Sequence, residues 1–102
     1  MRLVLAATTA LTLAACTWVP IQPAAQQVQV LRAAPAGCTQ LGEIEVEVTD
    51  RLALYRRNAI KVAEELETLA RNQAAGMPAT AIHPLTAPAD GQQKFAAWRC
   101  PR

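Results

Sequence analysis

Residues 43–48 read Glu-Ile-Glu-Val-Glu-Val, and this alternation is the clearest structural signal in the chain. Successive side chains of a β-strand point to opposite faces, so three β-branched residues share one face and three carboxylates the other. One face of the sheet therefore contacts water, which favours an antiparallel or mixed sheet covered on one side only. The carboxylates of Glu43, Glu45 and Glu47 can recruit a cation or a basic partner. The simpler interpretation is that they keep the strand soluble and discourage pairing at a sheet edge.

Three further segments have the pattern of strands. Upstream, Val28 and Val30 alternate with glutamines, which is typical of a half-buried strand. Downstream, residues 79–83 form a short candidate strand closed by Pro84, and residues 94–100 form a last strand rich in bulky side chains. Between these two, residues 86–92 contain Pro88 and Asp90-Gly91 and predict a turn-rich loop.

A helix is predicted from about Leu52 to Ala75, where the chain lacks Gly and Pro. Asp50 is a candidate N-cap, and Gly76 followed by Pro78 predicts the end of the helix. Glu67 and Arg71 are four residues apart, a spacing that favours an ion pair on the exposed face. Apolar residues recur at spacings of three and four: Ala59, Val62, Ala63, Leu66, Leu69, Ala70 and Ala74.

The resulting order is strand, strand, helix, strand, strand. It predicts an α+β fold: a two-layer sandwich in which about four strands form a sheet with one helix on one face. This domain covers residues 26–102, and a chain of 102 residues has room for one such unit. A net charge of +2, with both signs interspersed, excludes the basic surface of a nucleic-acid binder. Patterning alone does not give the order of the strands.

The N-terminus has the features of an export signal. Met1-Arg2 supplies one positive charge, and residues 3–15 are apolar or small apart from three threonines. This run is shorter than the roughly 20 apolar residues that a membrane-spanning helix needs. It ends in Leu13-Ala14-Ala15-Cys16, which resembles a bacterial lipobox: a branched apolar residue, two small residues, and a cysteine that accepts a diacylglyceryl group.

We therefore expect residues 1–15 to be a signal peptide and Cys16 to be the lipidated first residue of the mature chain. Residues 16–25 would be a proline-containing extended tether that reaches about 30 Å at most. Thr17 stands where an aspartate favours inner-membrane retention, so the lipobox implies the outer membrane and its periplasmic face. Trp18 is either an interfacial anchor or a core residue flanking a strand. The alternative is an ordinary signal peptide that leaves Cys16 unmodified.

Two cysteines remain once Cys16 is assigned to lipid. In an oxidising compartment, Cys38 and Cys100 form an even pair, so a disulfide is the expected state. A zinc site would need further ligands, and the chain offers a single histidine, His83. A redox C-x-x-C motif is absent, and a nucleophilic cysteine would need His83 nearby as its base. We expect no metal, no cofactor, no catalytic residue and no enzymatic activity.

Several segments together resemble a known family: Leu13–Cys16, the strand around Val28 and Val30, Cys38 with Leu41-Gly42-Glu43, and residues 71–82 and 99–100. The family that they resemble consists of small bacterial lipoproteins classed as a domain of unknown function, similar in pattern to the outer-membrane lipoprotein sensor of the Rcs stress phosphorelay. The resemblance implies a helix that ends in an Asn-x-Ala-Ala motif and leads into a strand.

Three functions remain open at this point. The first is a non-enzymatic binding module, anchored to the membrane by its N-terminal lipid, that meets an envelope protein through a sheet edge or through residues 86–92. The second is a stress-sensing regulator like the Rcs sensor, although that sensor has a longer linker and two disulfides. The third is a small envelope enzyme or cell-wall accessory.

Overall fold

The nine-residue strand β2 (Thr39–Glu47) is at one edge of the sheet in a computed structural model that describes residues 20–52 and 55–101. Ile44 and Val46 are buried, whereas Glu43, Glu45 and Glu47 are exposed. The alternation predicted from the sequence is thus confirmed. The strand also extends further towards the N-terminus than predicted, and its register with the next strand shifts between Gln40 and Gly42, which marks a bulge-like irregularity.

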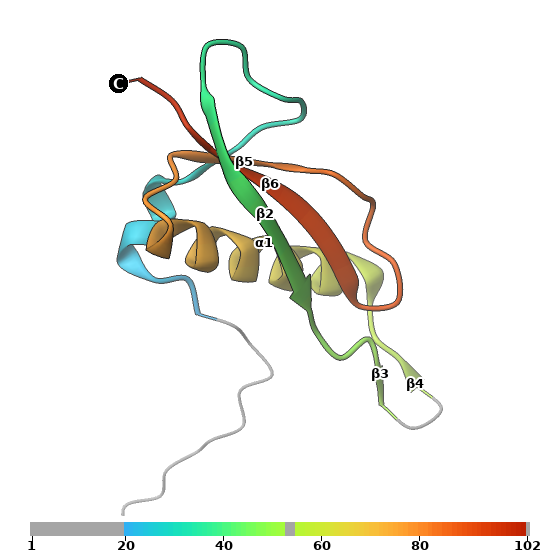
Figure 1. The fold of residues 1–102 in the computed structure, drawn as a ribbon. Helices are drawn as coiled ribbons and strands as arrows, with labels where there is room; N and C mark the ends of the chain where they lie inside the picture. The colour runs from blue at the N-terminus through green and yellow to red at the C-terminus, as the bar shows by residue number, and fades with distance from the viewer. Residues whose placement is uncertain (1–19, 53–54, 102) are drawn as a thin grey trace, which may run out of the picture.

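The sheet has four strands in the order β1-β5-β6-β2, and it carries one long helix, so the predicted α+β fold is confirmed. β1 (Gln29–Val30) runs parallel to β5 (Ala81–Pro84), and the other neighbours are antiparallel. β6 (Gln92–Arg99) lies between β5 and β2. Figure 1 shows α1 crossing one side of the sheet, while the connection from β1 to β2 extends beyond the end of the strands.

Helix α1 (Ala59–Gly76) buries Val62, Leu66, Ala70 and Ala74, the stripe that the apolar spacing predicted. Its predicted beginning at Leu52, with Asp50 as N-cap, is wrong. The N-cap is Asn58, whose Oδ1 accepts hydrogen bonds from the backbone N–H groups of Ile60 (2.9 Å) and Lys61 (3.2 Å). An asparagine oxygen satisfies two helix-end donors that otherwise lack partners, and this fixes the first turn.

A short hairpin occupies the segment that was expected to be the first turns of the helix. It consists of β3 (Arg51–Leu52) and β4 (Tyr55–Arg56), which pair with each other in a separate two-stranded sheet. Just beyond β4, the N–H of Arg57 donates to the carbonyl oxygen of Asp50 at 2.7 Å. This bond brings the two ends of the hairpin together and leaves the next residue, Asn58, in place to begin α1.

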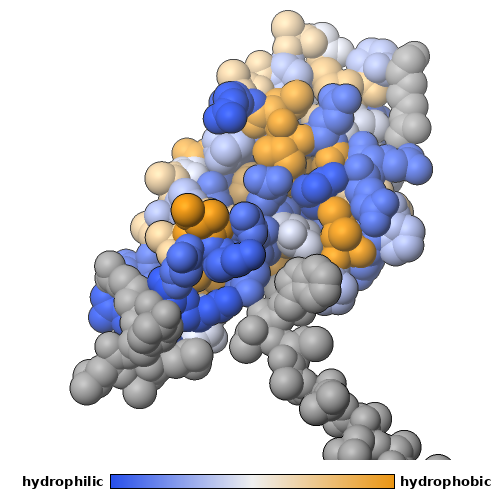
Figure 2. Space-filling view, turned by 180° about the vertical axis from the view of Figure 1, so that it is seen from behind, coloured by the Kyte–Doolittle hydropathy of each residue, from blue (hydrophilic) through white to orange (hydrophobic). Residues whose placement is uncertain are grey.

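The core lies between α1 and the inner face of the sheet. Its largest fully buried side chains are Phe95, Ile44, Leu66 and Ile82. Small residues of the helix, Ala70 and Ala74, allow the helix to approach the strands closely. From behind, the described surface is largely hydrophilic, and its apolar residues form separate patches (Figure 2). None of the helices in the described part of the chain has the length and apolarity that crossing a membrane requires.

Part of the predicted tether is folded. Residues Pro23–Gln27 form a 3-10 helix, η1, whose Ala25 is fully buried. The expectation of an extended segment through Ala25 is therefore wrong from Pro23 onward. The reason is tertiary, because Ala25 gains burial only where α1 lies against it. Cys16, Trp18 and the signal segment lie outside the described residues.

Candidate functional site

A disulfide links Cys38 to Cys100, with an S–S distance of 2.11 Å and a sequence separation of 62 residues. Cys38 directly precedes β2 and Cys100 directly follows β6. These two strands are antiparallel neighbours, so their ends meet at one end of the sheet. The bond predicted from the even number of cysteines thus ties together the strand that forms the edge and the strand beside it.

A cavity of about 580 Å³ opens beside this disulfide. Its walls come from η1, the end of α1 and the ends of β2 and β6, and Arg99 is the one charged residue that the described part of the chain contributes to them. The other lining residues are small, apolar or uncharged polar. Within residues 20–52 and 55–101, no three His, Cys, Asp or Glu side chains come together in a way that could hold a metal ion.

His83, the single histidine, is 9% exposed on β5. The indole Nε1–H of Trp98 on β6 donates a hydrogen bond to its Nδ1 at 2.8 Å, and the two rings are tilted by 35°. Nδ1 is the acceptor in this contact, which leaves Nε2 as the other ring nitrogen for any further partner. The contact fastens two adjacent strands and gives His83 a structural partner.

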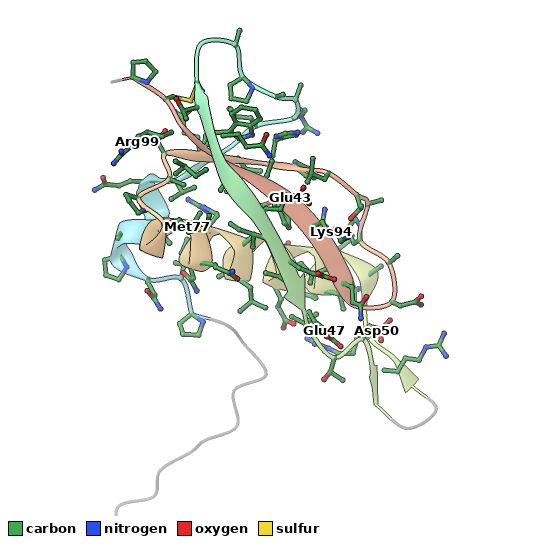
Figure 3. The ribbon with its side chains drawn as sticks, in the orientation of Figure 1. Glu43, Glu47, Asp50, Met77, Lys94 and Arg99 are labelled. Carbon is green, nitrogen blue, oxygen red and sulfur yellow. A yellow bond between two sulfur atoms is a disulfide. The ribbon has the colours of Figure 1, made fainter. Side chains whose placement is uncertain are left out.

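The acidic face of β2 continues beyond the strand. Figure 3 shows Glu43 and Glu47 along the strand, Asp50 beyond its end and Lys94 on the neighbouring strand, with Arg99 at the far end of the sheet. Lys94 is opposite Glu45 in the β2–β6 register. The ion pairs among the described residues are Arg57–Glu65 and Lys61–Glu64, so none of the three β2 carboxylates takes part in one.

The alternation of hydrogen-bonded and unbonded residues along β2 decides which of its backbone groups face outward. Val48 donates its N–H to the carbonyl oxygen of Gly91 at 2.7 Å, in line with the register that pairs Ile44 with Phe95. In an antiparallel pair, bonded residues alternate with unbonded ones. Ile44 and Val46 therefore bond to β6. The neighbouring residues of β6 bond to the other strand: the carbonyl oxygen of Lys94 accepts from the N–H of Leu85, just beyond β5, at 2.8 Å. Lys94 therefore directs its backbone groups away from Glu45, as expected if Glu45 does not bond to β6.

It follows that Glu43, Glu45 and Glu47 direct their backbone N–H and C=O groups away from β6. We call this row of outward backbone groups the β2 edge. β2 is the last strand in the sheet order, so the described residues supply no second strand beside it. The sequence predicted the exposed carboxylates, but not that the strand bearing them is at an edge.

The loop of residues 86–92 contains a tight turn. Ala89 and Gln92 exchange two backbone hydrogen bonds, of 3.0 and 2.9 Å, around Asp90 and Gly91. Both central residues have positive φ, 51° and 72°, as in the two-residue hairpin turns that Asp-Gly favours. The predicted turn is thus confirmed, and it positions Gly91 against the end of β2.

Two residues near the end of α1 hold the N-terminal segment in place. The Arg71 guanidinium donates from Nε to the carbonyl oxygen of Val28 (3.1 Å) and from Nη2 to that of Gln26 (3.0 Å). Asn72 accepts the N–H of Gln22 at 2.9 Å and donates to the carbonyl oxygen of Pro20 at 3.1 Å. These backbone contacts take the place of the predicted Glu67–Arg71 pair. Sequence spacing did not indicate them, because the partners are about fifty residues away.

A bidentate ion pair fastens the hairpin to α1. Arg57 donates from Nη2 to Glu65 Oε1 at 2.6 Å and from Nη1 to Glu65 Oε2 at 2.9 Å. Its Nη1 also donates to the carbonyl oxygen of Thr49 at 2.7 Å. The hydrogen bonds that Arg57 donates to the Glu65 carboxylate raise the pKa of Arg57 above its ordinary value. Arg57 therefore stays charged, and the pair is a structural clamp.

The fold and these contacts define a small α+β domain closed by one disulfide, with an acidic strand at one edge. The chain belongs to the family described as a domain of unknown function, DUF4156, which matches residues 19–100. The matched segment begins just before Pro20, at the point where Asn72 holds the N-terminal segment. Comparison with curated proteins and with solved structures finds no match.

Proposed function

We propose that this protein is a lipid-anchored component of the bacterial cell envelope, facing the periplasm from the outer membrane, and that its domain binds an envelope protein without catalysing a reaction. The single observation that carries the binding role is the β2 edge, a row of backbone donors and acceptors on a nine-residue strand that pairs with no second strand among residues 20–52 and 55–101. The lipobox-like residues Leu13–Cys16 support the anchor.

The disulfide supports an exported location. Cytosolic thiols are kept reduced, whereas the bacterial periplasm is oxidising. Cys38 and Cys100 are bonded at the ends of two neighbouring strands, so the pair has a structural role in joining them. With these two thiols joined, Cys16 is the one cysteine left for lipid attachment.

The residues that could take part in a reaction have contacts that favour a binding role over catalysis. His83 is the natural candidate for a general base, but its Nδ1 accepts the Trp98 indole hydrogen bond and the residue is largely buried. The cavity beside the disulfide presents one charged side chain, Arg99. Exposed strand edges, in contrast, bind extended segments of partner proteins by main-chain hydrogen bonds.

A sensor role like that of the Rcs lipoprotein is the second candidate, supported by the sequence resemblance. The reach of the chain favours the simpler binding role. Because Asn72 holds Pro20 and Gln22, three residues separate Cys16 from the held segment, and the four steps from Cys16 to Pro20 span at most about 14 Å at about 3.5 Å per residue. This is shorter than the 30 Å expected of an unfolded tether, so the domain would stay close to the membrane that holds it.

Substitution of the lipidated cysteine tests the proposal. With Cys16→Ala, we expect the protein to move from the outer-membrane fraction to the soluble periplasm, because two or more acyl chains are what make anchoring stable. Thr17→Asp is the matched control, for which we expect retention in the inner membrane. If the Cys16→Ala protein partitions as the unaltered protein does, the anchor is refuted.

A further inference from the structure

We propose that the β2 edge binds an extended basic segment of a partner protein, with lysine or arginine at every second position, which adds to the sheet as a fifth strand. This inference deepens the proposed function and rests on it for the setting. It names the partner by chemistry: a strand whose cationic side chains alternate with apolar or β-branched ones.

The backbone geometry fixes which residues of the partner meet the carboxylates. Glu43, Glu45 and Glu47 direct their backbone N–H and C=O groups outward in the plane of the sheet, and the pleat places their three side chains on one face of it. A strand added in antiparallel orientation therefore places its hydrogen-bonded residues directly opposite these three glutamates and on the same face. Three cations spaced two residues apart match three carboxylates spaced two residues apart.

The intervening residues of the partner meet the other face. They lie opposite Ile44 and Val46, on the side where the helix packs. Apolar surface lies close by on this side, because Met77, which packs against the core, is partly buried within reach of Gly42. Alternation of basic and apolar residues thus satisfies both faces of the added strand.

Charge argues against a second copy of this chain as the occupant. In an antiparallel β2–β2 pair centred on Glu45, the outward residues of each copy face each other, so Glu45 meets Glu45 and Glu43 meets Glu47. Like charges directly opposite are destabilising. Lys94 of β6 lies opposite Glu45, and among the described residues it is the one cation in register with the three glutamates. The acidic edge therefore repels its own copy and selects a basic strand.

Synthetic peptides test the alternation. We would titrate the protein as purified from cells, in detergent, with labelled Thr-Lys-Val-Lys-Val-Lys-Thr and follow fluorescence anisotropy at low ionic strength. The control is a block isomer, Lys-Lys-Lys-Thr-Val-Val-Thr, which has the same charge and composition. We expect the isomer to bind about tenfold more weakly, because it cannot place all three lysines opposite glutamates within one strand. Equal affinities would overturn the proposal.

N-methylation of the peptide tests strand addition separately from charge. Methylation of the three lysine amides removes the donors that face β2, and we expect it to weaken binding by about tenfold or more. Methylation of the two valine amides leaves those donors intact, so we expect the affinity to change little. If both methylated peptides bind alike, the contact is electrostatic only and no strand is added.

A charge reversal on the protein locates the site. Glu45→Lys is expected to weaken the alternating peptide about tenfold. Glu67→Lys, on the exposed face of α1, changes the net charge by the same amount and is expected to leave the affinity within about twofold. Equal effects of the two substitutions would place binding elsewhere. A dimer in sedimentation that Glu45→Lys alters would instead assign the edge to a second copy and overturn the proposal.

The outcomes separate this inference from the proposed function. Peptide binding does not depend on where the chain resides. If the unaltered protein is soluble with or without Cys16 and still binds the alternating peptide more tightly than the block peptide, the anchor is refuted and the β2 edge site is retained. An anchored protein that treats the alternating and block peptides alike would keep the anchor and refute the basic strand.

Discussion

Gly91 illustrates how a single residue sets the path of the chain beside the end of β2. Its φ of 72° lies in the left-handed region, where glycine carries no steric cost. A Cβ added at this position would overlap the carbonyl oxygen of Val48. Val48 also joins the turn to the end of β2, because its backbone N–H donates to the carbonyl oxygen of Gly91. The Asp-Gly pair indicated the turn from sequence, but not this close approach.

We therefore expect Gly91→Ala to destabilise the fold by about 2 kcal/mol, from the left-handed backbone and the contact with Val48. The measurement is the urea concentration at half unfolding. Gly76→Ala is the matched control: a Cβ there would meet nothing within 4 Å, and alanine has a higher helix propensity than glycine. A Gly91→Ala protein as stable as the Gly76→Ala protein would contradict the prediction.

Among the elements, α1 shows what a pattern can and cannot locate. The apolar spacing from Ala59 onward predicted its buried face, because that face follows from the 3.6-residue period. Its beginning was placed too early, since the absence of Gly and Pro between Leu52 and Asn58 permits a helix without requiring one. The hairpin forms instead because Arg57 reaches Thr49 and Glu65, contacts that no local rule reveals.

The attachment of the N-terminal segment is also an element-scale property, and Asn72 tests it. With Asn72→Ala, we expect the backbone amide of Gln22 to exchange with deuterium at least about tenfold faster, because its acceptor, Asn72 Oδ1, is removed. Gln73→Ala, on the exposed side of the helix, serves as the control and should leave this exchange unchanged. Equal exchange in both proteins would show that Gln22 is held by other contacts.

For the whole molecule, the disulfide closes a loop that contains most of the fold. In the chain-entropy model, cross-linking residues 62 apart stabilises the native state by about 4 kcal/mol. We expect Cys38→Ser with Cys100→Ser to lower the free energy of unfolding by about this amount, measured by urea denaturation. Adding a reductant to the unaltered protein should reproduce the loss, and should have no effect on the double variant. Unchanged stability in both experiments would contradict the prediction.

The sequence by itself determined the α+β class, the buried face of α1, the two faces of β2, the Asp-Gly turn and the pairing of Cys38 with Cys100. These follow from local periodicity, from backbone preferences and from counting. Only the tertiary structure decided that β2 is an edge strand, that β1 runs parallel to β5, and that Pro23–Gln27 packs on α1. Such features depend on which distant surfaces bury one another, and a pattern read along one segment carries no information about its neighbours in space.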